Sequence, residues 1–168
     1  MAGHRATIDW TLDGDFAARK YSRAHTLTFD HGLVVPGSSS PSIVPLPYSR
    51  EDAVDPEAAF TASLSSCHLL WFLDFAQQAG FLVASYRDKA VGTLAKGPEG
   101  RLMMTRVVLR PRVEFSGRQP TAAELADLHH RTHEACFIAN SVKTEVVVEI
   151  SAALSMDRSG LISRPKRF

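Results

Sequence analysis

The chain has 168 residues, which favours a single compact domain over residues 1–168. Apolar residues make up 45% and charged residues 22%, values that exclude a disordered tail protein, a collagen-like repeat and a disulfide-rich mini-domain. Nineteen basic against eighteen acidic side chains give a formal net charge of +1, so no overall field attracts nucleic acid. Two cysteines are too few for a stapled secreted scaffold but suit one redox couple.

No membrane or export segment is expected from the sequence. No run of about 18 apolar residues occurs, and no apolar signal core follows Met1–Arg5. The longest apolar stretch, Leu69–Leu73, is followed directly by Asp74. We therefore expect a cytoplasmic protein, in a compartment where thiols are kept reduced.

The first third of the chain is predicted to form short strands followed by a long loop. Residues 6–12 and 25–29 alternate polar and apolar side chains with a period of two, and 32–35 adds a short strand. Prolines and a Gly-Ser cluster mark residues 36–54 as an irregular crossing loop. A loop of this length is unusual in a small domain and indicates a functional role or a contact with a partner subunit.

A long apolar helix is predicted between Asp55 and Gly80. Asp55 can cap its N-terminus, Pro56 suits the first position and Gly80 can end it. Apolar residues lie nearly all round the helix, and a helix of that kind is buried in a core or an interface. One stripe at helical spacing consists of Phe60, Leu64, Cys67, Trp71 and Phe75.

The remaining chain is predicted to form two extended segments, a second helix and a final strand. The extended segments cover 81–94 and 102–115, with a turn between them. The final strand covers 142–154, and the basic tail 164–168 is expected to be a solvated end. This order of elements defines an α+β domain.

The second helix has a start signal of its own. Thr121 and Glu124 form a capping box, and the helix is predicted to run from there to about Phe137. It would therefore include Cys136, just as the first helix includes Cys67.

Both cysteines could be small buried apolar side chains, and their placement alone does not decide this. Their neighbours favour chemistry, because a thiolate needs nearby cations or hydrogen-bond donors. His68 follows Cys67, and three histidines precede Cys136, namely His129, His130 and His133.

A zinc site is a third interpretation of the same residues. His129 and His133 are one helical turn apart, with Cys136 three residues further on the same side. Histidines with this spacing are also common on solvated faces, and a fourth ligand would have to be Cys67 or an acid. We therefore predict no resident metal, and the usual nucleotide, serine-hydrolase and zincin motifs are absent.

Three stretches together resemble the OsmC/Ohr family of thiol-dependent hydroperoxide reductases. They are Asp55–His68 (DPEAAFTASLSSCH), Gly80 and His133–Val142 (HEACFIANSV). Tyr21–His25 further resembles the OsmC-like branch that has Cys-His at the first cysteine. The resemblance extends from about Trp10 to Ile150, and its motifs are specific in combination.

The resemblance implies an OsmC-like fold, in which antiparallel sheets wrap around two central helices of an intertwined homodimer. It also implies a cofactor-free peroxidase of the oxidative stress response that reduces organic hydroperoxides or hydrogen peroxide. Cys67 would be the peroxidatic thiolate and Cys136 the resolving thiol. A dithiol reductant, such as a lipoyl or thioredoxin-like protein, would recycle their disulfide.

By the same resemblance, Glu57 partners an arginine of the N-terminal strand region. Arg23 fits best because it precedes the strand at 25–29, and Arg19 is the alternative. A guanidinium stays charged and could stabilise the thiolate, while Glu57 could hold it through paired hydrogen bonds. Ten residues of helix span about 15 Å, so Glu57 and Cys67 share a site only if the helix bends near 61–63 or Glu57 comes from the other subunit.

Two features depart from the typical pattern of the family, namely the loop 36–54 and His68, which stands where Phe is usual. Both leave the preferred peroxide open. The nearest alternative function is a non-enzymatic OsmC-like domain that binds a small apolar ligand or senses the redox state.

Overall fold

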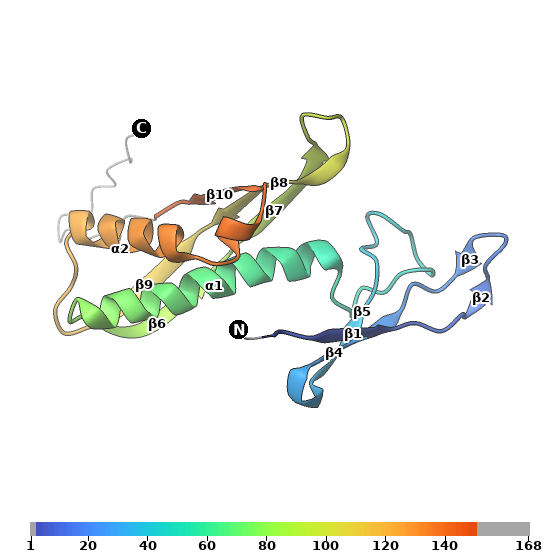
Figure 1. Cartoon of the computed structure of the whole chain (residues 1–168), viewed down its shortest axis with the longest axis horizontal. Coiled ribbons are helices and arrows are strands. Elements are labelled where there is room, and N and C mark those ends of the chain that lie inside the picture. Colours follow the sequence, from blue (N-terminus) through green and yellow to red (C-terminus); the bar gives the residue numbers. More distant parts are fainter. Residues whose placement is uncertain (1–2, 151–168) are drawn as a thin grey trace, which may run out of the picture. The chain divides into compact units, whose positions relative to one another are not determined.

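The computed structural model describes residues 3–150 (Figure 1). The chain divides into two compact units, Met1–Ala62 and Ser63–Phe168, and helix α1 (Pro56–Gln78) runs through the boundary. None of the helices in the described part is long and apolar enough to cross a bilayer. The predicted tail 164–168 and the end of the predicted strand 142–154 lie outside the described residues.

The first unit is built on a three-stranded antiparallel sheet with the order β1-β4-β5. The strands are β1 (Ala6–Asp9), β4 (His25–Phe29) and β5 (Val34–Gly37). Strand β4 has the predicted bounds, β1 is shorter than the predicted 6–12, and β5 begins and ends two residues after the predicted 32–35. A small hairpin between β1 and β4 was not predicted, because each of its strands has two residues. It pairs β2 (Gly14–Asp15) with β3 (Lys20–Tyr21).

The predicted crossing loop is present and is anchored beside β5. The Ser38 N–H donates to the Val54 carbonyl at 3.1 Å, and the Val54 N–H donates to the Pro36 carbonyl at 2.9 Å. Ser38 is fully buried, and its hydroxyl accepts the Arg50 N–H at 3.0 Å. These bonds satisfy backbone groups that an irregular loop would otherwise leave without partners.

Helix α1 begins and ends where its capping residues predicted. The Asp55 carboxylate accepts the Ala58 N–H at 2.8 Å, which is an N-cap contact. Gly80, at a φ of +76°, ends the helix, and the Phe81 N–H returns to the Ala76 carbonyl at 2.9 Å. The helix is continuous, so it has no break between Glu57 and Cys67.

The buried face of α1 differs from the predicted stripe. Leu64, His68, Phe72 and Ala76 are the buried positions, and Cys67 is half-buried. Because apolar residues occur on nearly every side of α1, the periodicity could not select the face that packs. Leu70 remains 64% exposed and Leu73 38% exposed in the single chain.

The two extended segments of the second unit are each divided into two strands. The first gives β6 (Leu82–Asp88) and β7 (Val91–Lys96), and the second gives β8 (Leu102–Leu109) and β9 (Pro111–Ser116). Strand β6 pairs antiparallel with β9, and β7 pairs antiparallel with β8. The final strand is shorter than predicted: β10 (Glu145–Val148) lies parallel to β8.

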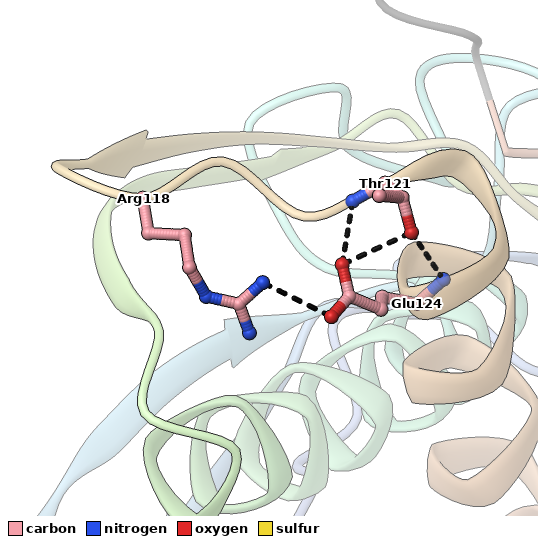
Figure 2. Close-up of polar contacts among 3 residues, drawn as sticks. All are labelled: Arg118, Thr121 and Glu124. Atoms are coloured by element: carbon pink, nitrogen blue, oxygen red, sulfur yellow. Dashed lines mark hydrogen bonds and ion pairs between the residues drawn. The ribbon is translucent and has the colours of Figure 1, made fainter.

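Helix α2 (Ala122–Ala135) carries the predicted capping box, which Figure 2 shows. The Glu124 N–H donates to the Thr121 hydroxyl at 3.2 Å, and the Thr121 N–H donates to the Glu124 carboxylate at 2.8 Å. Arg118 adds an ion pair at 3.0 Å. Hydrogen bonds from the Thr121 N–H, the Arg118 guanidinium and the Thr121 hydroxyl lower the pKa of the Glu124 carboxyl.

The end of α2 corrects the predicted boundary. The helix stops at Ala135, so Cys136 is its C-cap residue rather than a helical one. A short 3₁₀ turn, η2 (Ala139–Ser141), follows and turns the chain toward β10. No Gly or Pro marks this boundary, which is why the sequence pattern continued the helix to Phe137.

The core of the second unit lies between α1, α2 and the β6–β9 pair. Its buried members are Phe72 and Ala76 of α1, Leu128 of α2, and Phe81, which directly precedes β6. Partly buried side chains from the strands and helices surround them, namely Phe75, Val83, Tyr86, Val113, Phe115 and Leu125. This packing fixes the turn of α1 that bears Cys67 relative to the end of α2.

Candidate functional site

The two cysteines, far apart in sequence, meet in the second unit. Cys67 lies on α1, and Cys136 lies at the C-terminal end of α2. Both are free thiols, and Cys67 lies near enough to Cys136 to raise the pKa of its thiol. Two neighbouring thiols can form a disulfide when their Cα atoms come within about 7 Å of each other.

The backbone around Cys136 holds its side chain in place. The Cys136 N–H donates to the His133 carbonyl at 3.2 Å, and its own carbonyl accepts the Asn140 N–H at 3.0 Å. The Ala139 N–H donates to the Cys136 sulfur at 3.5 Å. The cap and the 3₁₀ turn therefore orient the thiol toward α1.

The two thiols have different environments. Cys136 is 2% exposed, and burial raises the pKa of its thiol to about 11, with the neighbouring Cys67 raising it further and the Ala139 N–H opposing the rise. Cys136 is therefore a neutral thiol at pH 7. Cys67 is half-buried and is therefore more exposed to solvent than Cys136.

An aromatic contact links the same two elements. Trp71, one turn after Cys67, meets Phe137, which follows Cys136, edge to face at 5.3 Å between ring centroids. Trp71 also stacks on Phe75 at 5.4 Å. Phe137 is 68% exposed, which gives an apolar surface beside the thiols.

The turn of α1 that precedes Cys67 is tied to the sheet. The Ser65 hydroxyl donates to the Asp88 carboxylate at 2.6 Å. The other oxygen of Asp88 accepts the Arg110 N–H at 2.6 Å, at the break between β8 and β9. Asp88 thus joins α1 to both strands of the β6–β9 pair.

The other predicted site residues, Arg23, Arg19 and Glu57, belong to the first unit. The Arg23 guanidinium lies 3.7 Å from the centre of the Tyr21 ring and donates to the Tyr21 carbonyl. Arg19 is exposed and has a φ of +60°. Among the ion pairs of residues 3–150, none joins Glu57 to either arginine. Their roles beside the thiol stay predictions.

His68, which follows Cys67 in the sequence, lies in the core. Its ring contacts His129, whereas the sequence had suggested it as a polar neighbour of the Cys67 thiol. His68 is 1% exposed, and its Nε2 lies 3.1 Å from Nδ1 of His129, which is 2% exposed. Burial, with nearby His129 and His133, lowers the pKa of His68 to about 3, and burial lowers that of His129 to about 4. Sequence reasoning missed this pair, since no local signal links residues on two helices.

The same pair bears on the zinc interpretation. His129 uses one nitrogen on His68 rather than standing with His133 and Cys136 as a ligand set. Within residues 3–150, no group of three or more His, Cys, Asp or Glu side chains is arranged to hold a metal ion.

Comparison with known proteins identifies the family of the chain. The model of the family described as OsmC-like protein matches residues 49–151, more than half of the chain. The chain therefore belongs to the OsmC-like protein family, and its fold is the α+β OsmC-like fold. None of the curated proteins matches it.

Among solved structures, an OsmC-like protein of unknown function from Vibrio cholerae is 51% identical. The match covers 90% of this chain and 100% of the Vibrio cholerae chain, with a TM-score of 0.88. An organic hydroperoxide resistance protein OsmC from Legionella pneumophila is 17% identical and covers 90% of this chain and 98% of its own, with a TM-score of 0.66. The organic hydroperoxide resistance protein OhrB of Bacillus subtilis is 17% identical and covers 88% and 98%, with a TM-score of 0.60.

Proposed function

We propose that the protein is a cysteine-based peroxidase that reduces organic hydroperoxides. The observation that carries the proposal is the contact between the Cys67 and Cys136 thiols. Family membership supports it, because hydroperoxide resistance proteins of Legionella pneumophila and Bacillus subtilis share the fold. The reaction needs one sulfur that attacks the peroxide and a second sulfur that resolves the product. Cys67 is the more exposed of the two cysteines and suits the first role, and the buried Cys136 suits the second.

The reaction begins at Cys67. Its thiolate sulfur attacks the terminal oxygen of the hydroperoxide, the O–O bond breaks, and the alkoxide leaves and takes up a proton as the alcohol. The sulfur is oxidised by two electrons to a sulfenic acid. The peroxide is reduced by the same two electrons.

Cys136 completes the turnover. It loses its proton and attacks the Cys67 sulfur, a disulfide forms, and the sulfenic oxygen leaves as water. A dithiol then reduces the disulfide and becomes a disulfide itself. Burial keeps Cys136 protonated, which reserves the first attack on peroxide for Cys67.

The remaining parts of the proposal rest on the family resemblance. Arg23, with Arg19 as the alternative, would stabilise the Cys67 thiolate, and Glu57 would hold that arginine. Since α1 is continuous, Glu57 would come from the other subunit of a homodimer. We further propose that the protein acts in the cytoplasm and is recycled by a lipoyl or thioredoxin-like dithiol protein.

Steady-state turnover tests the proposal. Cumene hydroperoxide and hydrogen peroxide are compared as substrates, each with dithiothreitol or with a monothiol as the reductant. We expect turnover with the dithiol, faster with cumene hydroperoxide, and its loss in Cys67→Ser. A rate no greater than that of the uncatalysed mixture would favour the second candidate, a non-enzymatic OsmC-like domain, for which the apolar surface at Trp71 and Phe137 is the supporting feature.

A further inference from the structure

A cavity lies between one face of α2 and strand β10, in the second unit. Its volume is about 250 Å³, below the range of drug-sized ligand sites, so it suits a small molecule. Its helix side consists of Ala126 and three histidines, and its strand side is apolar. The lining residues are Ala126, His129, His130, His133, Val146, Val148 and Ile150.

The two walls follow from the periods of the two elements. On α2, the three histidines follow Ala126 by three, four and seven residues. These four residues therefore share one face of the helix. The strand residues alternate and therefore share one face of β10 and its continuation. A polar wall thus opposes an apolar one.

The tautomer of His129 can be assigned from its buried partner. Nε2 of His68 and Nδ1 of His129 lie 3.1 Å apart, so one of them donates. Nδ1 of His68 is buried and has no partner. A buried N–H without a partner is rarer in proteins than an acceptor without one, so this nitrogen is bare and Nε2 of His68 carries the proton.

It follows that Nδ1 of His129 accepts, and that its Nε2 carries the proton. His129 lines the cavity, and within residues 3–150 its hydrogen bond is made by Nδ1, so we place the second nitrogen, Nε2, at the cavity. His129 is otherwise 2% exposed. A buried side chain therefore presents an unused N–H to an open space.

His133 repeats the arrangement one turn further along α2. Its Nδ1 is likewise buried without a partner, and the same reasoning puts its proton on Nε2. Side chains one turn apart have Cβ atoms about 5–6 Å from each other. The cavity thus offers two neighbouring N–H donors facing an apolar strand.

We propose that this cavity binds a small apolar carboxylic acid, whose carboxylate accepts from Nε2 of His129 and His133 while its apolar body packs on Val146 and Val148. A carboxylate has two acceptor oxygens and no donor, which matches the two N–H donors of His129 and His133. An amine lacks an acceptor, and an alcohol supplies one oxygen. The site is separate from the thiol pair and does not depend on the peroxidase proposal.

Titration with benzoate, followed by ¹⁵N–¹H NMR of the histidine rings, tests this inference on the full chain. Before benzoate is added, both rings should show the Nε2–H tautomer. Benzoate should then shift the His129 and His133 signals to saturation, whereas benzylamine should not. His133→Phe should weaken binding about tenfold, the effect of one lost hydrogen bond.

Two controls keep the test decisive. Ala126→Leu narrows the cavity without touching a histidine and should also weaken benzoate binding. His4→Gln changes an exposed histidine outside the cavity and should leave binding unchanged. The inference is overturned if benzoate does not bind saturably, if Ala126→Leu binds it as tightly as the parent chain, or if benzyl alcohol or benzylamine binds equally well.

Discussion

The Cys67 thiol on α1 lies beside the Cys136 thiol at the end of α2, near enough to raise the pKa of Cys136. The pair joins a half-buried cysteine to a buried one. That difference in burial distinguishes the proposed attacking thiol from the resolving thiol.

The first prediction concerns Cys136. In Cys136→Ser, the Cys67 thiolate remains and should still reduce one equivalent of peroxide. The product should stay at the sulfenic acid, because no second thiol is available to condense with it. Mass spectrometry should then find a dimedone adduct on Cys67, and excess peroxide should convert the sulfur to sulfinic acid. A variant that turns over repeatedly would contradict the role of Cys136.

The second prediction concerns the arginine. If Arg23 stabilises the Cys67 thiolate, Arg23→Ala should slow both iodoacetamide alkylation of Cys67 at pH 7 and peroxide reduction. The loss should reach the 10²-fold range that removing one electrostatic stabiliser typically causes. Arg19→Ala is the matched control and should have a much smaller effect. The reverse order would assign the role to Arg19.

The third prediction concerns the oligomeric state. Leu70 and Leu73 are exposed on α1 in the single chain, and burying them would stabilise a dimer. Sedimentation equilibrium at micromolar concentration should therefore give the mass of a dimer. Leu70→Glu should shift the population toward monomer, whereas Leu102→Glu, a change at a similarly exposed leucine of β8, should not. A monomeric parent chain would remove the second subunit that the Glu57 proposal needs.

The fourth prediction concerns pH. His68 and His129 have folded-state pKa values of about 3 and about 4, below the value of 6.5 for a free side chain. Between pH 6.5 and about 4 the unfolded chain therefore binds more protons than the folded one, and the free energy of unfolding falls as the pH falls. Each histidine contributes a slope of up to about 1.4 kcal/mol per pH unit.

Urea denaturation at pH 7 and pH 5 measures that slope. The double variant His68→Leu/His129→Leu should show a flatter dependence, and His4→Gln should match the parent. Ring NMR signals supply a second readout in the parent chain. If both buried histidines titrate near pH 6.5, the argument from burial fails.

Local signals predicted the parts of the fold that depend on neighbouring residues. The caps at Asp55, Gly80 and Thr121 are confirmed, because each acts within one helical turn. The packed face of α1 could not be predicted, since an apolar surface all round gives no preferred side. The His68–His129 bond joins two helices and has no local signature.

The pairing of the two cysteines is another contact between distant residues that local sequence signals could not predict. Spacing alone left both thiols open to a structural role, and their pairing was implied only by the family resemblance. The structure brings the two sulfurs together through the packing of α1 against α2 around Phe72 and Leu128. Arg23 and Glu57 lie in the other unit, so their roles depend on the resemblance still.

The most direct test of the account is the state of the two cysteines after one equivalent of cumene hydroperoxide. The fully reduced protein is mixed with the peroxide, the free thiols are blocked, and the peptides are analysed by mass spectrometry. The account predicts an internal Cys67–Cys136 disulfide in the parent chain and no peroxide consumption in Cys67→Ser. Unchanged thiols in the parent chain, or normal single turnover in Cys67→Ser, would contradict it.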